Sequence, residues 1–208
     1  MKYRVIGNNA QTVAIEIQEK EAIFTRLGRL LFARGSVNAQ SSPQGTYWTV
    51  VTDAINKPGD PPIVLMSSDG ASGLIGLKSP SVGRIHVVNL ESISKAIIKR
   101  SAILAAQEGL RFDPVHLDGE DAGKIIPGLF VTVSGSGKVF LHGSGNLVDF
   151  SLGDSEKMVA DGQFILALYG EIDYSPRPVG SPYSIDTEPY MLMMHLTGPG
   201  RVVLQTMH

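Results

Sequence analysis

The glycine-rich stretch 133–152, VSGSGKVFLHGSGNLVDFSL, comes closest to a phosphate-binding pattern. A Walker-type loop has a glycine, four residues, and then Gly-Lys followed by Ser or Thr, so that amides, ammonium and hydroxyl surround phosphate and magnesium. Here a valine follows Gly137-Lys138, and Thr132 stands where the first glycine belongs. The dinucleotide pattern fails as well, because Phe140 replaces its third glycine. We therefore expect these glycines to turn the chain between strands rather than to bind a nucleotide.

The histidines of the chain bear on metal binding through their spacing. They are His86, His116, His142, His195 and His208. Strand-built sites commonly use His-x-His and helical ones use histidines at i and i+4, and neither spacing occurs. His86 and His142 could still meet in space beside a carboxylate, so a metal-dependent barrel enzyme stays open as one hypothesis. The other interpretation is ordinary surface or strand histidines, and we assign no metal ligand.

Patterns for nucleophilic and acid–base catalysis are missing from the sequence. There is no Gly-x-Ser-x-Gly elbow, and the lack of cysteine excludes thiol catalysis and thiolate metal sites. The acidic run Asp118, Glu120 and Asp121 lacks the alternating ligands and distal glutamate of a calcium loop, so we interpret it as a solvated loop. We predict no catalytic residue and no cofactor.

Basic residues form two weak clusters, Arg26, Arg29 and Arg34 in one and Lys99 and Arg100 in the other. They either lie at equivalent turns of a repeat and form a patch, or they solubilise strand ends. The formal net charge of −2 and a pI near 6.2 give no overall basic field for nucleic acid. Nucleic-acid binding would need the three arginines in one exposed stripe beside Trp48, and we consider such a partner improbable.

An internal repeat indicates the elements that position these residues. Residues 83–113 align without a gap on 145–175, a shift of 62 positions, with six identities and a matched apolar pattern. A fainter third copy near the N-terminus sets Gly28 on Gly162 and Ala33 on Ala167. Self-similarity of this kind changes how each local pattern is interpreted.

The segment 93–107, ISKAIIKRSAILAAQ, is the one whose interpretation the repeat changes. By itself its apolar spacing and good helix formers are typical of a helix. Its counterpart carries Asp161-Gly162, a turn signal, between two short apolar runs. Because two copies of one unit should share one structure, we predict strand, tight turn and strand in both, with Lys99-Arg100 at the first turn.

The remaining patterns favour an all-β fold. Short apolar runs lie between turns rich in the 23 glycines and 12 prolines, which is typical of a sandwich or barrel of duplicated units. The last two predicted strands flank the turn 198–200. The first of them carries Met191, Met193 and Met194, which would suit either core packing or an adaptable binding surface. We predict one domain, 1–208, of two pseudo-equivalent halves at about 1–113 and 129–208, joined by 114–128.

The composition and the N-terminal sequence bear on oligomerisation and on cellular location. Charged residues are 18% and hydrophobic ones 43%, a balance that hints at burial in an oligomer. No window approaches 18 apolar residues, so we expect no transmembrane segment. The start MKYRVIGNNAQ is unlike a signal or transit peptide, and we expect a cytoplasmic location.

Short motifs resemble those of a known family. They are Gly198-Pro199-Gly200 followed by an apolar strand and Gln205-Thr206, and the pairs Gly162 with Ala167 and Gly28 with Ala33. The chain is similar to the altered inheritance of mitochondria family, a former domain of unknown function. The resemblance implies a fold like that of the tryptophan RNA-binding attenuator protein, often assembled as a trimer, and it carries no catalytic residue.

These observations leave three hypotheses for function. The first is a non-enzymatic, homo-oligomeric β scaffold that binds a protein or a small ligand. The second is a nucleic-acid or small-ligand binding protein by analogy of fold. The third is the metal-dependent enzyme, which requires His86 and His142 within ligand reach of each other.

Overall fold

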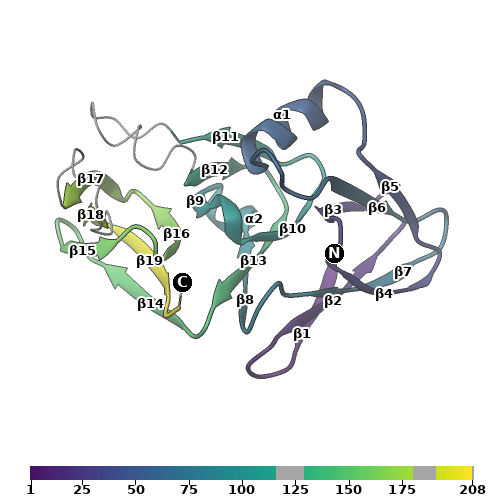
Figure 1. The fold of residues 1–208 in the computed structure, drawn as a ribbon, viewed down its shortest axis with the longest axis horizontal. Helices are drawn as coiled ribbons and strands as arrows, with labels where there is room; N and C mark the ends of the chain where they lie inside the picture. The colour runs from purple at the N-terminus through teal and green to yellow at the C-terminus, as the bar shows by residue number, and fades with distance from the viewer. Residues whose placement is uncertain (116–128, 180–190, 208) are drawn as a thin grey trace.

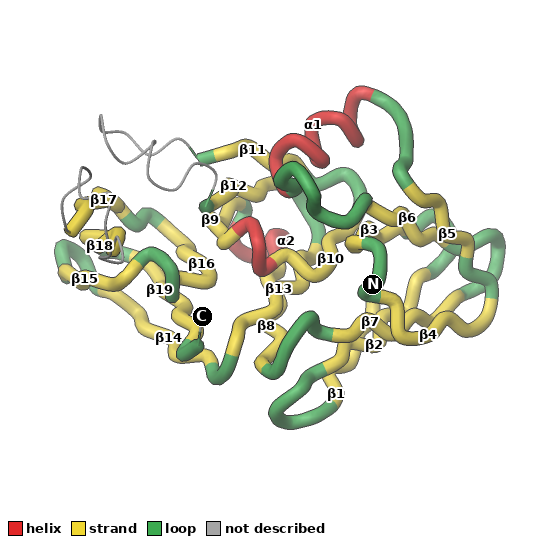
Figure 2. The backbone as a smooth tube through the Cα atoms, in the orientation of Figure 1, coloured by secondary structure: helices red, strands yellow, loops and turns green. Residues whose placement is uncertain are grey.

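The computed structural model describes residues 1–115, 129–179 and 191–207. Strands dominate these ranges, with two short helices among them (Figures 1 and 2). The predicted all-β class is therefore confirmed. No helix within the described ranges is long and apolar enough to cross a membrane.

The described strands after β1 (Lys2–Ile6) form three consecutive sets of six. The first set is β2 (Thr12–Ile17), β3 (Ala22–Arg26), β4 (Leu30–Gly35), β5 (Asn38–Ser41), β6 (Ile63–Ser67) and β7 (Gly73–Lys78). The second is β8 (Gly83–Asn89), β9 (Lys95–Lys99), β10 (Ile103–Gln107), β11 (Arg111–Pro114), β12 (Phe130–Ser134) and β13 (Lys138–Ser144). The third is β14 (Leu147–Leu152), β15 (Lys157–Asp161), β16 (Ile165–Gly170), β17 (Asp173–Val179), β18 (Met191–Thr197) and β19 (Gly200–Gln205). Helix α1 (Thr46–Ile55) follows β5, α2 (Leu90–Ile93) follows β8, and the 3₁₀ turn η1 (Arg100–Ala102) joins β9 to β10.

Each set pairs its strands in the same order. The first, sixth and third strands lie side by side, as in β2-β7-β4, and so do the fourth, fifth and second, as in β5-β6-β3. The second strand of one set then pairs with the third strand of the next, through β3 with β10 and β9 with β16. These two junctions produce the six-stranded sheets β5-β6-β3-β10-β13-β8 and β11-β12-β9-β16-β19-β14.

The four sheets are stacked, and one apolar cluster fills each space between neighbours. The first cluster joins the sheet β1-β2-β7-β4 to the first six-stranded sheet, the second joins the two six-stranded sheets, and the third joins the second of these to β15-β18-β17. Successive residues of β13 show the consequence, since Val139 and Leu141 enter one cluster and Phe140 another. Both faces of each six-stranded sheet are buried, so β10 and β16 are nearly continuous runs of buried residues.

Helix α1 covers the second cluster on the side of β3 and β11. Its Trp48 packs edge-on against Phe24 of β3, with ring centroids 5.6 Å apart, and Phe24 makes a similar contact with Phe112 of β11 at 5.6 Å. The Tyr47 hydroxyl accepts a hydrogen bond from the Gly109 amide at 2.9 Å. Phe24 therefore connects the first set, the helix and the second set.

The predicted strand, turn and strand is confirmed over 95–107. The turn lies at Arg100–Ala102 rather than at Lys99-Arg100, because Lys99 still belongs to β9, and Ile93 ends helix α2. The shift of 62 is reproduced by the strands, because β9 and β15 begin at Lys95 and Lys157 and β10 and β16 at Ile103 and Ile165. Gly135, Gly137 and Gly145 turn the chain between β12, β13 and β14, as predicted, whereas Gly143 lies within β13.

The third copy lies one residue away from its predicted alignment. Each third strand has an irregularity near its start, between Leu30 and Phe32, Ile103 and Ala105, and Ile165 and Ala167. These irregularities make Phe32, rather than Ala33, the counterpart of Ala167. The division into two halves joined by 114–128 stays a prediction, since 116–128 lies outside the described residues, whereas the strand pairing follows three sets.

Truncating Phe24 tests the role of the second cluster. We expect Phe24→Ala to lower the free energy of unfolding by about 3–5 kcal/mol, because it removes a fully buried ring between two sets of strands. Urea unfolding monitored by the fluorescence of Trp48, the single tryptophan of the chain, would measure this loss. The matched control is Val50→Ala on the exposed side of α1, expected to change stability by less than about 0.5 kcal/mol. Equal effects of the two substitutions would contradict the packing argument.

Candidate functional site

The turns between the second and third strands of the sets carry the basic residues singled out in the sequence. Arg26 ends β3 and Lys99 ends β9, so they hold equivalent positions, while Arg29 and Arg100 lie in the turns that follow. The structure therefore places these four residues at or next to equivalent turns, and a basic patch formed by them on an oligomer stays a prediction. Arg34 is not among them, because it lies on β4 opposite Leu74.

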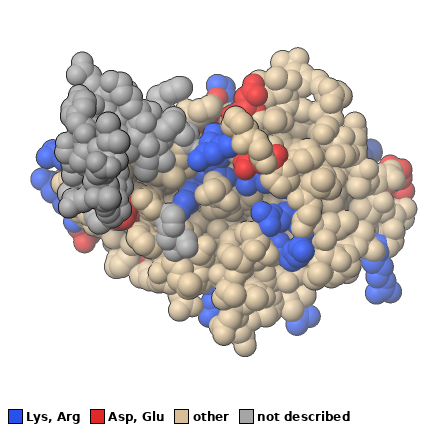
Figure 3. All heavy atoms as spheres, viewed as in Figure 1, with Lys and Arg blue, Asp and Glu red and all other residues tan. Residues whose placement is uncertain are grey.

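A polar hollow of about 450 Å³ opens beside these turns. Its polar lining includes Lys57, Ser81, Lys99, Ser101, His142 and Gln163. No aspartate or glutamate lines it within the described part of the chain. Figure 3 shows Lys and Arg side chains gathered around a hollow at the centre of the face drawn. The lining of the hollow therefore presents ammonium, hydroxyl and amide groups, and the nearby carboxylates Asp60 and Asp161 lie outside it.

Lys99 is the buried cation of the hollow. Its Nζ donates a hydrogen bond to the Gln163 carbonyl at 2.5 Å, across the junction of β9 with β16. Burial lowers the pKa of Lys99, and the nearby Asp161 carboxylate opposes that change. Among the hydrogen bonds of the described residues Nζ has this one partner, which leaves its other two donor positions for a ligand.

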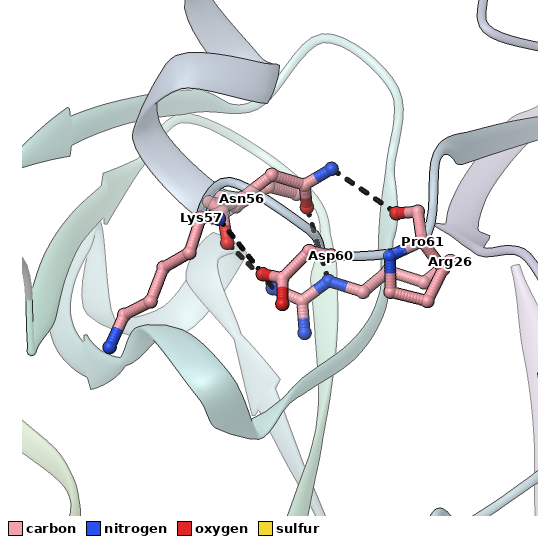
Figure 4. A network of polar contacts seen from close by, with 6 residues as sticks. Arg26, Asn56, Lys57, Asp60 and Pro61 are labelled. Atoms are coloured by element: carbon pink, nitrogen blue, oxygen red, sulfur yellow. Dashed lines mark hydrogen bonds and ion pairs between the residues drawn. The ribbon is translucent and has the colours of Figure 1, made fainter.

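Arg26 holds the segment that carries Lys57 (Figure 4). The Arg26 guanidinium donates from Nη2 to the Ile55 carbonyl at 2.6 Å and from Nε to Asn56 Oδ1 at 3.2 Å. Asp60 lies 3.8 Å from Nη2 and accepts a hydrogen bond from the Lys57 amide at 2.9 Å. In Figure 4 the Lys57 side chain extends away from this network. The buried guanidinium is thus structural, while the Lys57 ammonium is available.

Burial lowers the pKa of Arg26, and Asp60 opposes that effect while Arg29 and Arg100 add to it. The repulsion between these three cations means that the turns concentrate positive charge. Within the described part of the chain, Asp60 is the carboxylate that acts on both Arg26 and Arg100. An added anion would relieve this imbalance.

His142 and Ser81 form the pair in the hollow that most resembles a base and a nucleophile. Ser81 Oγ lies 2.9 Å from His142 Nε2. The pKa of His142 is lowered, first by burial and then by the charge of Arg29, so the imidazole favours its neutral form. However, Nδ1 of His142 is buried and has no hydrogen-bond partner among the described residues. The carboxylate that would orient the ring in a catalytic triad does not occupy that position.

His86 lies away from His142, although the two are on neighbouring strands. His86 pairs with Leu141 and His142 with Ile85, so the two imidazoles leave the sheet on opposite faces. His86 Nε2 lies instead 2.6 Å from the Tyr169 hydroxyl. The approach of the two histidines required by the metal-enzyme hypothesis does not occur, and the described residues contain no group of three or more metal-ligating side chains.

Other predicted features are dispersed. Trp48 and Arg26 are both buried, so the arginines form no exposed stripe beside the indole. Met194 is buried in the third apolar cluster, and Met193 is half-buried. His195 lies on β18, and His116, His208 and the acidic run at 118–121 lie outside the described residues.

Three residues reach the hollow from outside the basic clusters and were not among the predicted site residues. Lys57 follows α1, Gln163 lies in the turn before β16, and Gln205 ends β19. The family motif did include Gln205, whose Oε1 accepts a hydrogen bond from the Ser144 amide at 3.2 Å. The repeat was the available signal for Gln163, because the structure aligns its turn with that of Lys99-Arg100.

Comparisons with known proteins support the fold. A family model described as mitochondrial biogenesis AIM24 matches residues 3–207. The crystal structure of a Streptococcus pyogenes protein, a structural genomics target, is similar with a TM-score of 0.76 and 19% sequence identity, covering 100% of this chain and 94% of that chain. At that identity the likeness shows the fold alone. No curated protein matches the sequence.

His142 provides a test of the electrostatics of the hollow. Because its folded-state pKa is lowered, the unfolded chain binds the proton more readily, and stability should fall as the pH drops from about 6.5 toward the folded-state pKa. The His142→Gln variant should show a shallower fall, by up to about 1.4 kcal/mol per pH unit. Urea unfolding at pH values between about 5 and 7 would measure both slopes. Identical slopes would show that His142 is not protonated more weakly in the folded state.

Proposed function

The chain belongs to the mitochondrial biogenesis AIM24 family, which confirms the resemblance in its sequence, and we propose that it is a non-enzymatic β scaffold that binds a small anion. The observation that carries the proposal is the hollow beside the turns. Lys57 and Lys99 line it, and no carboxylate does so within the described residues.

The donors of the hollow suit a phosphate or carboxylate group. Charge-assisted hydrogen bonds from ammonium to such oxygens are stronger than neutral ones. The hydroxyls of Ser81 and Ser101 add neutral donors beside the two lysines. A volume of about 450 Å³ exceeds a bare phosphate, which leaves room for a small organic acid or phosphate ester.

The arrangement of His142 supports binding rather than catalysis. A base that activates a serine is normally oriented by a third group, and the Nδ1 of His142 has no such partner among the described residues. The neutral imidazole of His142 instead forms part of the polar lining of the hollow. The Ser81 hydroxyl can turn toward a ligand while Nε2 holds its rotamer.

The proposal includes assembly into a homo-oligomer, with a trimer favoured from the family resemblance, and a protein partner. Exposed apolar side chains on the first set, such as Leu27 and Leu31, support this part. The attenuator-like fold and the cytoplasmic location expected from the sequence stay predictions. Nucleic-acid binding is the alternative, and the burial of Arg26 and Trp48 counts against it.

Phosphate binding by the lysine variants tests the site. Titration calorimetry with inorganic phosphate should show saturable binding that weakens at least tenfold, about 1.4 kcal/mol, in Lys57→Gln. Lys99→Met should weaken it further, because Lys99 is the buried cation. Because Lys57 is exposed, Lys57→Gln should fold like the wild type, so weaker phosphate binding in this variant would report on the site.

The matched control is Lys95→Gln, which removes an exposed lysine at the other end of β9. This variant should bind phosphate like the wild type. Equal weakening in all three variants would mean nonspecific charge attraction, and an absence of saturable binding in the wild type would reject the anion site.

A further inference from the structure

A second cavity, the edge cleft, has a volume of about 460 Å³ and shares no lining residue with the hollow beside the turns. Its walls come from β8, α2, β16 and β19. The polar side chains that line it are those of His86, Asn89, Ser92, Tyr169 and Arg201. Within the described residues, no aspartate or glutamate is part of this lining. The two cavities are therefore separate sites with different residues.

Opposite walls of the edge cleft belong to different sheets. Strand β8 is the outermost strand of the sheet β5-β6-β3-β10-β13-β8, whereas β16 and β19 belong to the second six-stranded sheet. His86 lies on the same face of β8 as Val88, which enters the second cluster, and Tyr169 belongs to that cluster from the other sheet. Helix α2 contacts β9 of one sheet and β13 of the other, and Figure 1 shows it between them. The edge cleft is thus the open end of the packed space between the two sheets.

A hydrogen bond joins the two sheets at this open end. His86 Nε2 lies 2.6 Å from the Tyr169 hydroxyl. Burial lowers the pKa of His86 and raises the pKa of Tyr169, so both groups are neutral at about pH 7. The bond uses one donor of this pair, either the phenol O–H or the Nε2–H. The pair therefore keeps one further donor, whichever ring nitrogen carries the proton.

Arg201 adds a cation that is held in one position. Its Nε donates a hydrogen bond to Asp149 Oδ1 at 2.6 Å, and its Nη2 donates to the other oxygen of that carboxylate. Its guanidinium carbon lies 5.9 Å from the centre of the Tyr169 ring. Among the hydrogen bonds of the described residues, Nη1 has no partner, so this end of the guanidinium can donate to an oxygen in the cleft.

The repeat shows that the edge cleft is particular to this pair of sheets. The shift of 62 sets Gln107 on Tyr169. Gln107 Oε1 accepts a hydrogen bond from the Lys138 amide at 2.8 Å, so this side chain bonds within its own sheet. Tyr169 instead bonds to His86 of the facing sheet. The third set thus places a phenol across the gap where the second set satisfies a neighbouring amide.

The inner wall of the edge cleft is apolar. Val88 is buried in the second cluster, and the half-buried Ile93 of α2 packs against the same cluster. Gly170 and Gly200 contribute backbone alone to the lining. An apolar group that enters the cleft would contact Val88, Ile93 and the Tyr169 ring, and this contact would remove apolar surface from water.

We infer that the edge cleft binds a small carboxylic acid with an apolar body. Arg201 holds the carboxylate, and the pair of His86 and Tyr169 donates one more hydrogen bond to it. The apolar body lies against Val88 and Ile93. The volume of about 460 Å³ is within the range of small-molecule sites. This site goes beyond the proposed function, because the hollow beside the turns has a polar lining with two lysines.

Titration calorimetry with sodium hexanoate tests the polar end of the site. The wild type should bind hexanoate saturably, and Arg201→Gln should weaken this binding about tenfold or more, because it removes the charge-assisted hydrogen bonds. The Arg201 side chain is 53% exposed, so this variant should fold like the wild type. The matched control is Arg111→Gln, which removes another exposed arginine paired with an aspartate, Asp113, and it should leave hexanoate binding unchanged.

Two further probes and one variant test the apolar end. Acetate has the same charge without the apolar body, and hexan-1-ol has the apolar body without the charge, so each should bind about tenfold or more weakly than hexanoate. Ser92→Trp places a large ring at an exposed position of α2 that lines the cleft. It should abolish saturable hexanoate binding while the circular dichroism of the strands is unchanged.

The lysine variant of the hollow separates the two sites. Lys57→Gln should bind hexanoate like the wild type. Loss of hexanoate binding in Lys57→Gln but not in Arg201→Gln would assign the acid to the hollow and overturn the inference. No saturable binding of hexanoate to the wild type, or equal binding of acetate or hexan-1-ol, would overturn it too. The phosphate titration decides the anion site separately in each case.

Discussion

The pairing of a second strand with the third strand of the next set is the interaction on which the rest of the structure depends. Without it, each set would be two separate three-stranded sheets, each too small to bury both its faces. The β3 to β10 and β9 to β16 contacts extend these into six-stranded sheets that lie between apolar clusters on both sides. The same contacts bring the basic turns together, because each turn lies where one of the joined strands ends. The core and the candidate site therefore share one cause.

Much of the fold could be predicted because the repeat carried information that local propensity did not. The residues of 93–107 favour a helix locally, and the structure has two strands there since both faces of the sheet are buried. Helix α1 was not predicted: its one buried face, with Trp48 and Ile55, covers a cluster that exists only after distant strands have joined. The third copy was misaligned by one residue because Gly28 and Gly162, the glycines that aligned it, are not structural counterparts.

The candidate site was predictable only in part, for a related reason. The positions of Arg26 and Lys99 at equivalent turns followed from the repeat. The separation of His86 from His142 depended on the pairing of β8 with β13, which fixes the face of each side chain. Lys57 reaches the hollow from a segment that no sequence pattern connects to the turns, and Gln163 is related to them only through the repeat. Long-range register, rather than residue type, decided which polar groups share a cavity.

The interleaving of the sets also determines the order in which the chain can complete its sheets during synthesis. Strand β3 emerges from the ribosome long before β10, and β9 long before β16. Each nascent second strand therefore waits with an open edge until the next set has been translated, and contacts so distant in sequence form slowly. The vectorial growth of the polypeptide and its architecture are thus matched, since every newly made set closes the edge left by the one before it.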